Sequence, residues 1–328
     1  MTRKLLFDNR WIGKTGIGRY SHELSKFANL SEVKFIQGSN PTKIRELFKP
    51  IIWPRSSSAY YSPGYISRPF FNPQYITIHD LILLEPGMGN IFHKLYFNVF
   101  LKYQLVRRKI RLITVSNHSR NQLSNWCRIP VQEIELVPNG ISQGILEASK
   151  ELNDNIRGKT ILFVGNSKPH KRFDLFVDAV NLLSESCTVR IVGIGLDRMR
   201  ISNHHDVSVS NNISDEILSQ LYLKTNVLVV TSLYEGFCMP VLEGSFLGCK
   251  VVHLGVLPTV TEILGDSSFS THGSLDAEIL ATTIQIALGS RKRLSENERA
   301  NLATRYDWDA SRKKLRKILN MSTLEAMM

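Results

Sequence analysis

The sequence predicts an α/β protein with two doubly wound parallel sheets, one in each half of the chain. Its 328 residues exceed the roughly 250–300 at which single cores stop growing. Short apolar runs alternate with amphipathic helical patterns, and the alternation restarts after a polar stretch near the middle. Strands that alternate with helices are typical of parallel sheets.

The first half contains short β-branched or aromatic runs bounded by Pro, Gly or Ser. The predicted strands are 4–8, 33–36, 59–62, 75–79 and 112–115. A glycine-containing loop at 13–18 leads into a predicted helix from Arg19 to about Phe27. Ser116 is expected to cap a helix that ends near Cys127.

A polar stretch at about 143–157 has little periodicity and is the predicted interdomain linker. We therefore place an N-terminal domain at 1–145 and a second domain at 155–305. The second domain has predicted strands at 160–164, 189–192, 207–209, 227–231 and 250–253. Helices are expected at 173–184, 214–223 and 240–247, and from about 276 onward.

The composition restricts the classes of function. Aromatic residues at 9% and charged residues at 21% argue against disorder, and a formal net charge of +12 favours an anionic partner. The four cysteines lack zinc-ligand spacing, and no nucleic-acid-binding motif is evident. No window is apolar enough for a signal peptide or a membrane span, so we expect a cytoplasmic protein with reduced thiols.

The most informative segment is 231–244. It predicts a strand end, a polar loop with Glu235, and a helix with Pro240 in its first turn and Glu243 about one turn further in. Both carboxylates are then expected to approach one ligand at the carboxyl edge of the sheet. N–H groups around Gly236 and Phe237 can serve an anion or a sugar hydroxyl. The simpler interpretation is a capping loop with two ordinary acidic residues.

The spacing Glu235-x7-Glu243 resembles the E-x7-E motif of retaining glycosyltransferases of family four, which have the GT-B fold. The family more often has Gly where Cys238 stands. Residues 163–171 resemble the family's phosphate-binding loop, and Lys171 matches its lysine. The resemblance implies two Rossmann-like domains facing across a cleft.

Further segments support the resemblance. The arginine that many members carry in the phosphate loop falls at Asn166, a contact that Lys168 or Arg172 can replace. In the N-terminal half, Gly16 and Gly18 resemble the glycine loop over the donor diphosphate. We also note His79, which resembles the strand-end histidine beside the donor sugar. The Trp308 region resembles the family's final helix, which implies that 306–328 cross back to the N-terminal domain.

The resemblance implies a hexosyltransferase that retains the anomeric configuration. Lys171 and the glycine loop would offset the charge of the leaving diphosphate. Glu235 would hold hydroxyls of the donor sugar, Glu243 the nucleotide ribose, and His79 would contact the reacting centre. We expect neither a metal nor a cofactor.

The sequence looks most like bacterial mannosyl- and rhamnosyltransferases of surface polysaccharide assembly, which favours GDP-mannose or dTDP-rhamnose as donor. The expected acceptor is a saccharide, lipid-linked, in O-antigen, lipopolysaccharide or capsule synthesis. Three alternatives remain: a sugar-nucleotide epimerase of the same fold, a phosphorylase, and a non-enzymatic basic α/β binding protein.

Residues 91–111 predict an aromatic-rich helix with a basic end. One interpretation is a core helix whose end is solvated. The other is peripheral attachment to the anionic inner face of the cell membrane. The two interpretations are compatible.

Overall fold

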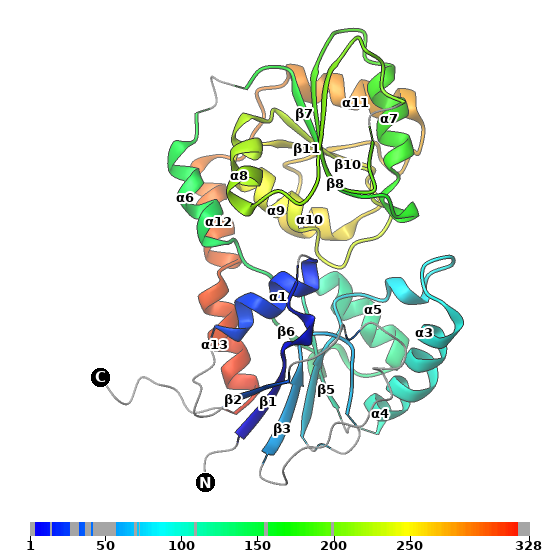
Figure 1. Cartoon of the computed structure of the whole chain (residues 1–328), viewed down its shortest axis with the longest axis vertical. Coiled ribbons are helices and arrows are strands. Elements are labelled where there is room, and N and C mark those ends of the chain that lie inside the picture. Colours follow the sequence, from blue (N-terminus) through cyan, green and yellow to red (C-terminus); the bar gives the residue numbers. More distant parts are fainter. Residues whose placement is uncertain are drawn as a thin grey trace. The chain divides into compact units, whose positions relative to one another are not determined.

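The computed structural model describes residues 4–13, 15–26, 33–36, 41, 57–68, 71, 73–107, 110–153, 157–197 and 200–320. The chain forms two compact units (Figure 1). The first unit consists of residues 1–140 and 306–328, and the second unit consists of residues 141–305.

The first unit is built on a parallel sheet of order β2-β1-β3-β4-β5-β6. Its strands are β1 (Lys4–Asp8), β2 (Val33–Ile36), β3 (Ser57–Ser62), β4 (Gln74–Thr77), β5 (Ile110–Thr114) and β6 (Glu135–Leu136). Its longer helical elements are α1 (Gly16–Ser25), α3 (Ile91–Leu95), the π-helical η3 (Tyr96–Leu101), α4 (Lys102–Val106), α5 (Asn117–Cys127) and α13 (Trp308–Ile318).

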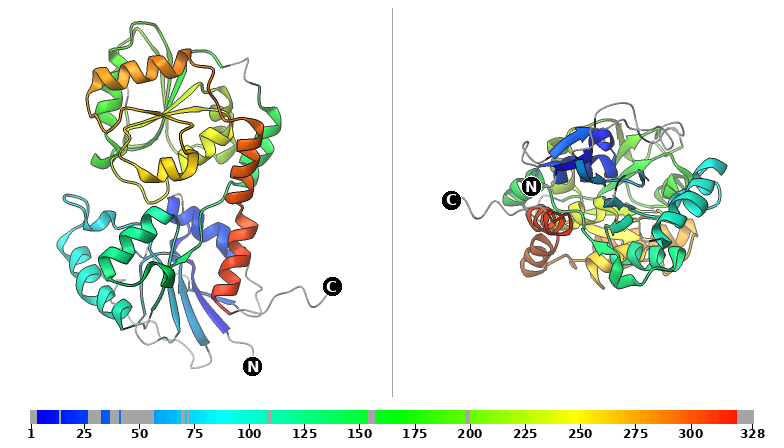
Figure 2. Two further views of the ribbon diagram at one scale, coloured as in Figure 1. Left: turned by 180° about the vertical axis from the view of Figure 1, so that it is seen from behind. Right: turned by 90° about the horizontal axis from the view of Figure 1, so that it is seen from below.

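Successive side chains of a strand point in opposite directions, so the residues of β4 alternate between the two faces of this sheet. Each face is covered by different helices. Ile76 belongs to a buried cluster with side chains of η3, α4 and α5. Thr77 faces the other way, where its hydroxyl bonds Tyr61 Oη at 3.0 Å. Figure 2 shows α1 and α13 side by side, and residues of the two helices are in contact.

The second unit is built on a parallel sheet of order β12-β11-β10-β7-β8-β9. Its strands are β7 (Thr160–Asn166), β8 (Thr188–Ile194), β9 (Asp206–Ser210), β10 (Val227–Val230), β11 (Lys250–His253) and β12 (Phe269–Ser270). Its longer helices are α6 (Gln143–Ala148), α7 (Phe173–Asn181), α8 (Asp215–Lys224), α9 (Met239–Phe246), α10 (Pro258–Leu264), α11 (Ala277–Gly289) and α12 (Glu296–Arg305).

The core of the second unit joins one face of this sheet to α7 and α11. Ile161, Phe163 and Val189 pack there with Phe176 and Ile284, all at most 2% exposed. Burying an aliphatic or aromatic side chain of this size contributes about 1.5–3 kcal/mol. The strands are therefore fixed in register, which in turn fixes the loops at their carboxyl ends.

Several boundaries differ from the sequence-based expectation. The helix expected from Arg19 begins at Gly16, because the Thr15 hydroxyl caps it by accepting the Gly18 N–H at 3.1 Å. The stretch expected as a linker from 143 begins instead with α6, whose buried Ile145 and Ala148 belong to the second unit. The chain passes between units at 140–141 rather than at 145–155.

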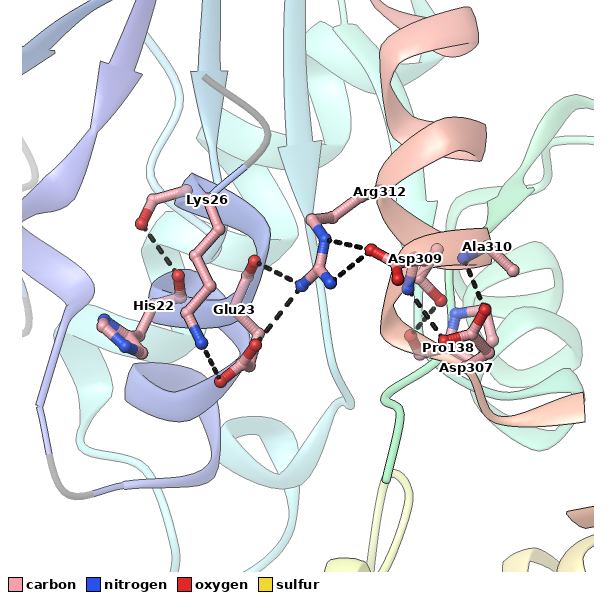
Figure 3. A network of polar contacts seen from close by, with 10 residues as sticks. His22, Glu23, Lys26, Pro138, Asp307, Asp309, Ala310 and Arg312 are labelled. Atoms are coloured by element: carbon pink, nitrogen blue, oxygen red, sulfur yellow. Dashed lines mark hydrogen bonds and ion pairs between the residues drawn. The ribbon is translucent and has the colours of Figure 1, made fainter. Parts of the chain in front are cut away.

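The final helix α13 is an integral part of the first unit (Figure 3). Arg312 donates from Nη1 to the Glu23 main-chain oxygen at 3.2 Å and to its carboxylate at 3.3 Å. Ser311 Oγ donates to the Pro138 carbonyl at 2.9 Å. Trp308 packs so closely on Gly140 that a β-carbon at position 140 would lie 2.6 Å from the main-chain nitrogen of Trp308. Only glycine therefore fits at position 140.

None of the helices within the described ranges combines the length and the apolar run needed to cross a bilayer.

Candidate active site

The loops after β7 and β10 meet at the carboxyl edge of the second sheet. These strands are neighbours, but the chain moves from β7 to one side of the sheet and from β10 to the other. The Leu233 N–H donates to the His170 carbonyl at 2.8 Å, and the Thr231 hydroxyl donates to the Lys171 carbonyl at 2.6 Å. Open α/β sheets bind ligands at such a topological switch point.

Lys171 and Glu235 form an ion pair at this switch point. The ammonium Nζ donates to Glu235 Oε1, and the two side chains are only 15% and 16% exposed. The phosphate-loop lysine and the first carboxylate of the E-x7-E segment are thus brought together although they lie 64 positions apart in the chain. A group that approaches one of them approaches both.

The three other residues expected to bind the donor near Lys171 are placed differently. Arg172 has a left-handed backbone and donates to the Asp174 carboxylate at 3.1–3.2 Å, so its charge is already paired. Asn166 Oδ1 accepts the Lys168 N–H at 3.1 Å and so holds the turn. The Lys168 residue is exposed. Lys171 is therefore the least exposed of the three cations Lys168, Lys171 and Arg172.

Glu243 lies on α9 and is 2% exposed. The Tyr222 hydroxyl of α8 donates to Glu243 Oε2 at 3.4 Å. Sequence reasoning missed Tyr222, which is fully buried and sits in an ordinary amphipathic helix without any pattern that marks it. The position of the carboxylate is thus fixed by a neighbouring helix.

Cys238 lies between the two glutamates in the chain and within the electrostatic reach of both. Burial raises the pKa of its thiol, and the carboxylates of Glu235 and Glu243 raise it further. Its backbone is left-handed, with φ 61° at the N-cap of α9. Gly236 and Phe237, the expected donor-binding positions beside it, are buried.

This backbone predicts opposite outcomes for two substitutions. Cys238→Gly should keep transfer within a few-fold of the parent, because glycine adopts positive φ without steric cost. Cys238→Val should lose about 1–3 kcal/mol of unfolding free energy in urea titrations, because a β-branched residue is strained there. Cys249→Val is the matched control, since Cys249 is also buried but is not among the described residues with positive φ. Equal losses in both valine variants would contradict the backbone argument.

His170 is a second residue that sequence reasoning missed. Burial and, less strongly, the Lys171 charge lower the pKa of its imidazole to about 4, while the charge of Glu235 acts in the opposite direction. The ring is therefore neutral at pH 7 beside the ion pair. In the sequence it appears only as part of a basic cluster.

The carboxyl edge of the first sheet holds His79. The residue follows β4, and its Nε2 lies 3.0 Å from the Pro63 carbonyl oxygen. A carbonyl can only accept, so Nε2 carries the hydrogen and Nδ1 is left as the acceptor. Burial lowers the pKa of this imidazole to about 4. His79 is consequently a neutral side chain over the whole physiological range.

The first turn of α1 lies near His79. Gly16 is exposed at the start of the helix, whereas a β-carbon on Gly18 would lie 2.2 Å from the Gly13 oxygen. Tyr20, one turn further, packs edge-to-face on His79 with 4.7 Å between the ring centroids. Its ring centroid lies 6.0 Å from that of Trp308. The first unit thus brings the glycines and His79 to one edge of its sheet, while Lys171, Glu235 and Glu243 belong to the second unit.

The low pKa of His79 makes stability depend on pH. The unfolded imidazole titrates near 6.5 and the folded one near 4, so the unfolded state binds more protons between these values. His79 alone should therefore lower the unfolding free energy by about 1–2 kcal/mol as pH falls from 7 to 5. Urea titrations of the parent and of His79→Gln at both pH values measure this. An unchanged pH dependence in the variant would show that another group is responsible.

Among the described residues, no group of three or more His, Cys, Asp or Glu side chains is arranged to hold a metal ion.

Parts of the chain are similar to known glycosyltransferases. Residues 158–289, which contain the whole switch-point site, match the family described as glycosyl transferases group 1. The O-antigen chain mannosyltransferase RfbU of Salmonella typhimurium is 26% identical over 206 residues, covering 60% of this chain and 56% of that protein. The MMP alpha-(1->4)-mannosyltransferase of Mycolicibacterium hassiacum is 23% identical over 231 residues, covering 66% and 55%. The chain therefore spans little more than half the length of these relatives.

Solved structures show the same architecture over nearly the whole chain. HepE from Anabaena in complex with UDP-glucose superposes with a TM-score of 0.69 at 16% identity, covering 97% of this chain and 99% of that one. Sucrose-phosphate synthase from Thermosynechococcus elongatus gives a TM-score of 0.72 at 15% identity, covering 98% of each chain. The chain has the GT-B fold. The predicted fold class is thereby confirmed. In this GT-B protein, the segment 158–289 that matches glycosyl transferases group 1 lies within the second unit.

Proposed function

We propose that the chain is a retaining glycosyltransferase that transfers a sugar from a nucleotide diphosphate donor to a saccharide acceptor. The observation that carries the proposal is the Lys171–Glu235 ion pair at the switch point of the second sheet. It lies inside the segment that matches glycosyl transferases group 1.

The ion pair suits a donor with a charged leaving group and a polyhydroxylated sugar. A diphosphate that reaches Lys171 competes with Glu235 for the ammonium and offers two or more negative charges against one. Lys171 can then offset charge on the departing diphosphate, which is the main electrostatic demand of the reaction. The freed Glu235 oxygens can accept hydrogen bonds from hydroxyls of the donor sugar.

The remaining residues complete the proposal. Glu243, held by Tyr222, would accept the hydroxyls of the nucleotide ribose. From the first unit, Gly16 and Gly18 would let main-chain N–H groups serve the diphosphate, and His79 would contact the sugar near the reacting carbon. The neutral imidazole of His79 offers an acceptor nitrogen there and adds no second cation.

The donor sugar we propose is mannose or rhamnose, carried by GDP or dTDP. Two mannosyltransferases among the relatives support mannose. HepE was solved in complex with UDP-glucose, so UDP-sugars are included among the donors to be tested. The acceptor we propose is a lipid-linked saccharide in the assembly of surface polysaccharide, in line with the O-antigen relative. An enzyme that uses such an acceptor works at a membrane surface, and we propose the cytoplasmic face.

A ligand-stabilisation screen tests the donor proposal. Saturation with the correct one of GDP-mannose, dTDP-rhamnose or a UDP-sugar should stabilise the protein by about 2–4 kcal/mol when the ligand is at 100–1,000 times Kd. The unfolding midpoint should then rise by several degrees. If no nucleotide sugar shifts the midpoint, the donor proposal is wrong.

Product analysis separates the proposal from its rivals. Incubation with donor and acceptor should give a product whose anomeric configuration, read by NMR, matches that of the donor. An inverted linkage would overturn retention. An epimerised sugar nucleotide formed without acceptor would identify a sugar-nucleotide epimerase instead.

A further inference from the structure

The segment 91–106 of the first unit concentrates exposed apolar side chains. It contains six of the fifteen large hydrophobic side chains that are exposed among the described residues. These six, which we call the 91–106 face, are Ile91 (72% exposed), Phe92 (53%), Leu95 (57%), Val99 (59%), Tyr103 (57%) and Val106 (55%). Scattered exposed apolar residues are ordinary, but a contiguous set marks an interaction surface.

The 91–106 face is the outer side of a continuous helical segment that is also part of the core. Tyr96, Phe97, Leu101 and Leu105 of the same α3–η3–α4 run are at most 1% exposed and pack against the sheet. The exposed side chains recur every three or four residues from Phe92 to Val106, so they share one face of the helix. Figure 1 shows this run on the side of the sheet away from α1 and α13. The core-helix interpretation therefore holds for the inner face of this segment, and the outer face is exposed.

The chain segment that carries this face has basic residues but no acidic ones. No Asp or Glu occurs between Glu85 and Glu133, whereas this stretch contains eight Lys and Arg residues. Two of these cations sit against aromatic rings at the edge of the helix. Lys102 Nζ lies 5.9 Å from the Trp126 ring, and the Arg107 guanidinium lies 5.4 Å from the Tyr103 ring. Such side chains cover apolar surface with their stems while the charge stays in water.

We propose that the 91–106 face docks onto the surface of an anionic lipid bilayer, with the helix lying in the plane of the interface. Apolar side chains on one side and basic residues at the rim are the pattern of interfacial helices. A second copy of this chain fits poorly, because an isologous contact would oppose two copies of a segment that carries basic residues and no acidic ones. The shallow hollow between Val99, Tyr103 and Val106 can receive acyl-chain segments.

The inference is independent of the donor chemistry, since binding requires no sugar nucleotide. It deepens the proposed function by giving the enzyme a means of reaching a lipid-linked acceptor. The donor proposal and the docking proposal can fail separately. Stabilisation by a nucleotide sugar tests the second unit, and vesicle binding tests the first unit.

Co-sedimentation with vesicles tests the docking. The full chain should bind vesicles of phosphatidylcholine mixed with phosphatidylglycerol and should bind vesicles of phosphatidylcholine alone at least about tenfold more weakly. Raising the ionic strength from about 0.01 M to about 1 M shortens the Debye length from about 30 Å to about 3 Å and should largely abolish binding. Binding that depends on neither the lipid charge nor the salt concentration would overturn the proposal.

Two sets of variants assign the binding to this face. Phe92→Ser, Leu95→Ser and Tyr103→Ser combined should weaken binding to anionic vesicles at least about tenfold. Lys94→Gln, Lys102→Gln, Arg107→Gln and Arg111→Gln combined should weaken it similarly and flatten its salt dependence.

A matched control uses exposed apolar residues of the second unit. Ile217→Ser, Ile279→Ser and Ile286→Ser combined remove side chains that are 46–59% exposed and should leave vesicle binding unchanged. Circular dichroism and melting curves confirm folding of each variant. Equal losses in the control and in the 91–106 variant would overturn the assignment. So would a parent chain that dimerises through this face, as size-exclusion chromatography with light scattering would reveal, and ignores vesicles.

Discussion

Replacing Glu235 with alanine should reduce sugar transfer by well over tenfold while the second unit stays folded. The carboxylate is the partner of Lys171 and the proposed acceptor for donor hydroxyls. Its removal leaves the ammonium without this counter-charge and the sugar without its hydrogen-bond acceptor. Each hydrogen bond that involves a charged group is worth about 1.5–3 kcal/mol, so two such losses account for an effect of this size. Initial rates at saturating donor measure it.

The control is another paired carboxylate of the same unit. Asp206 bonds Arg190 at 2.9 Å at the start of β9, which places it at the opposite edge of the sheet. Asp206→Ala should leave transfer near the parent rate, because exposed pairs contribute only about 0–1 kcal/mol. Near-parental transfer by a folded Glu235→Ala protein would refute the assigned role.

The second large effect is expected at Lys171. Lys171→Ala should weaken donor binding and slow turnover together, because the ammonium offsets charge that grows on the leaving diphosphate. By analogy with other oxyanion donors, the barrier should rise by about 2–4 kcal/mol, which is a loss of roughly 30- to 1,000-fold in rate. The Michaelis constant for the donor and the turnover number, measured separately, resolve the two contributions.

Lys168→Ala is the matched control for this variant. Lys168 is three residues away on the same loop but exposed, so its removal should change the rate little. A large loss in Lys168→Ala with no loss in Lys171→Ala would show that Lys168, and not Lys171, corresponds to the phosphate-loop lysine. The double variant Lys171→Ala, Glu235→Ala should lose less than the sum of the single losses, because the two side chains share one contact.

The strands were predictable because they are short segments rich in β-branched or aromatic residues. The run Lys250–His253 and the run Val33–Ile36 are both strands at their predicted limits. Pro240 likewise places the start of α9 within one residue. The six-residue α6 was not predictable, since so short a helix gives no clear period and depends on packing against α8. The π-helical turn at Tyr96–Leu101 also leaves no signature in the residues.

Candidate site residues could be selected from the sequence where chemistry depends on residue type and spacing. Glu235, Glu243 and Lys171 were selected in this way, and the structure shows the contact between Glu235 and Lys171 that no spacing specifies. The pairing of Arg172 with Asp174 depends on a left-handed backbone at Arg172. The Tyr222 contact depends on how two helices pack. Such facts come from tertiary structure, which a single sequence does not display.

The return of α13 to the first unit also has a consequence for synthesis on the ribosome. Residues 141–305, the 165 residues of the second unit, are translated before the helix that packs on α1 and on Pro138. At about 5–20 residues per second, this interval lasts about 8–33 s. During that time the buried face of Tyr20 and Leu24 lacks its final covering helix, whereas the second unit is complete as soon as Arg305 has emerged. The second unit is therefore expected to finish folding first, and the domain that begins the chain is completed last.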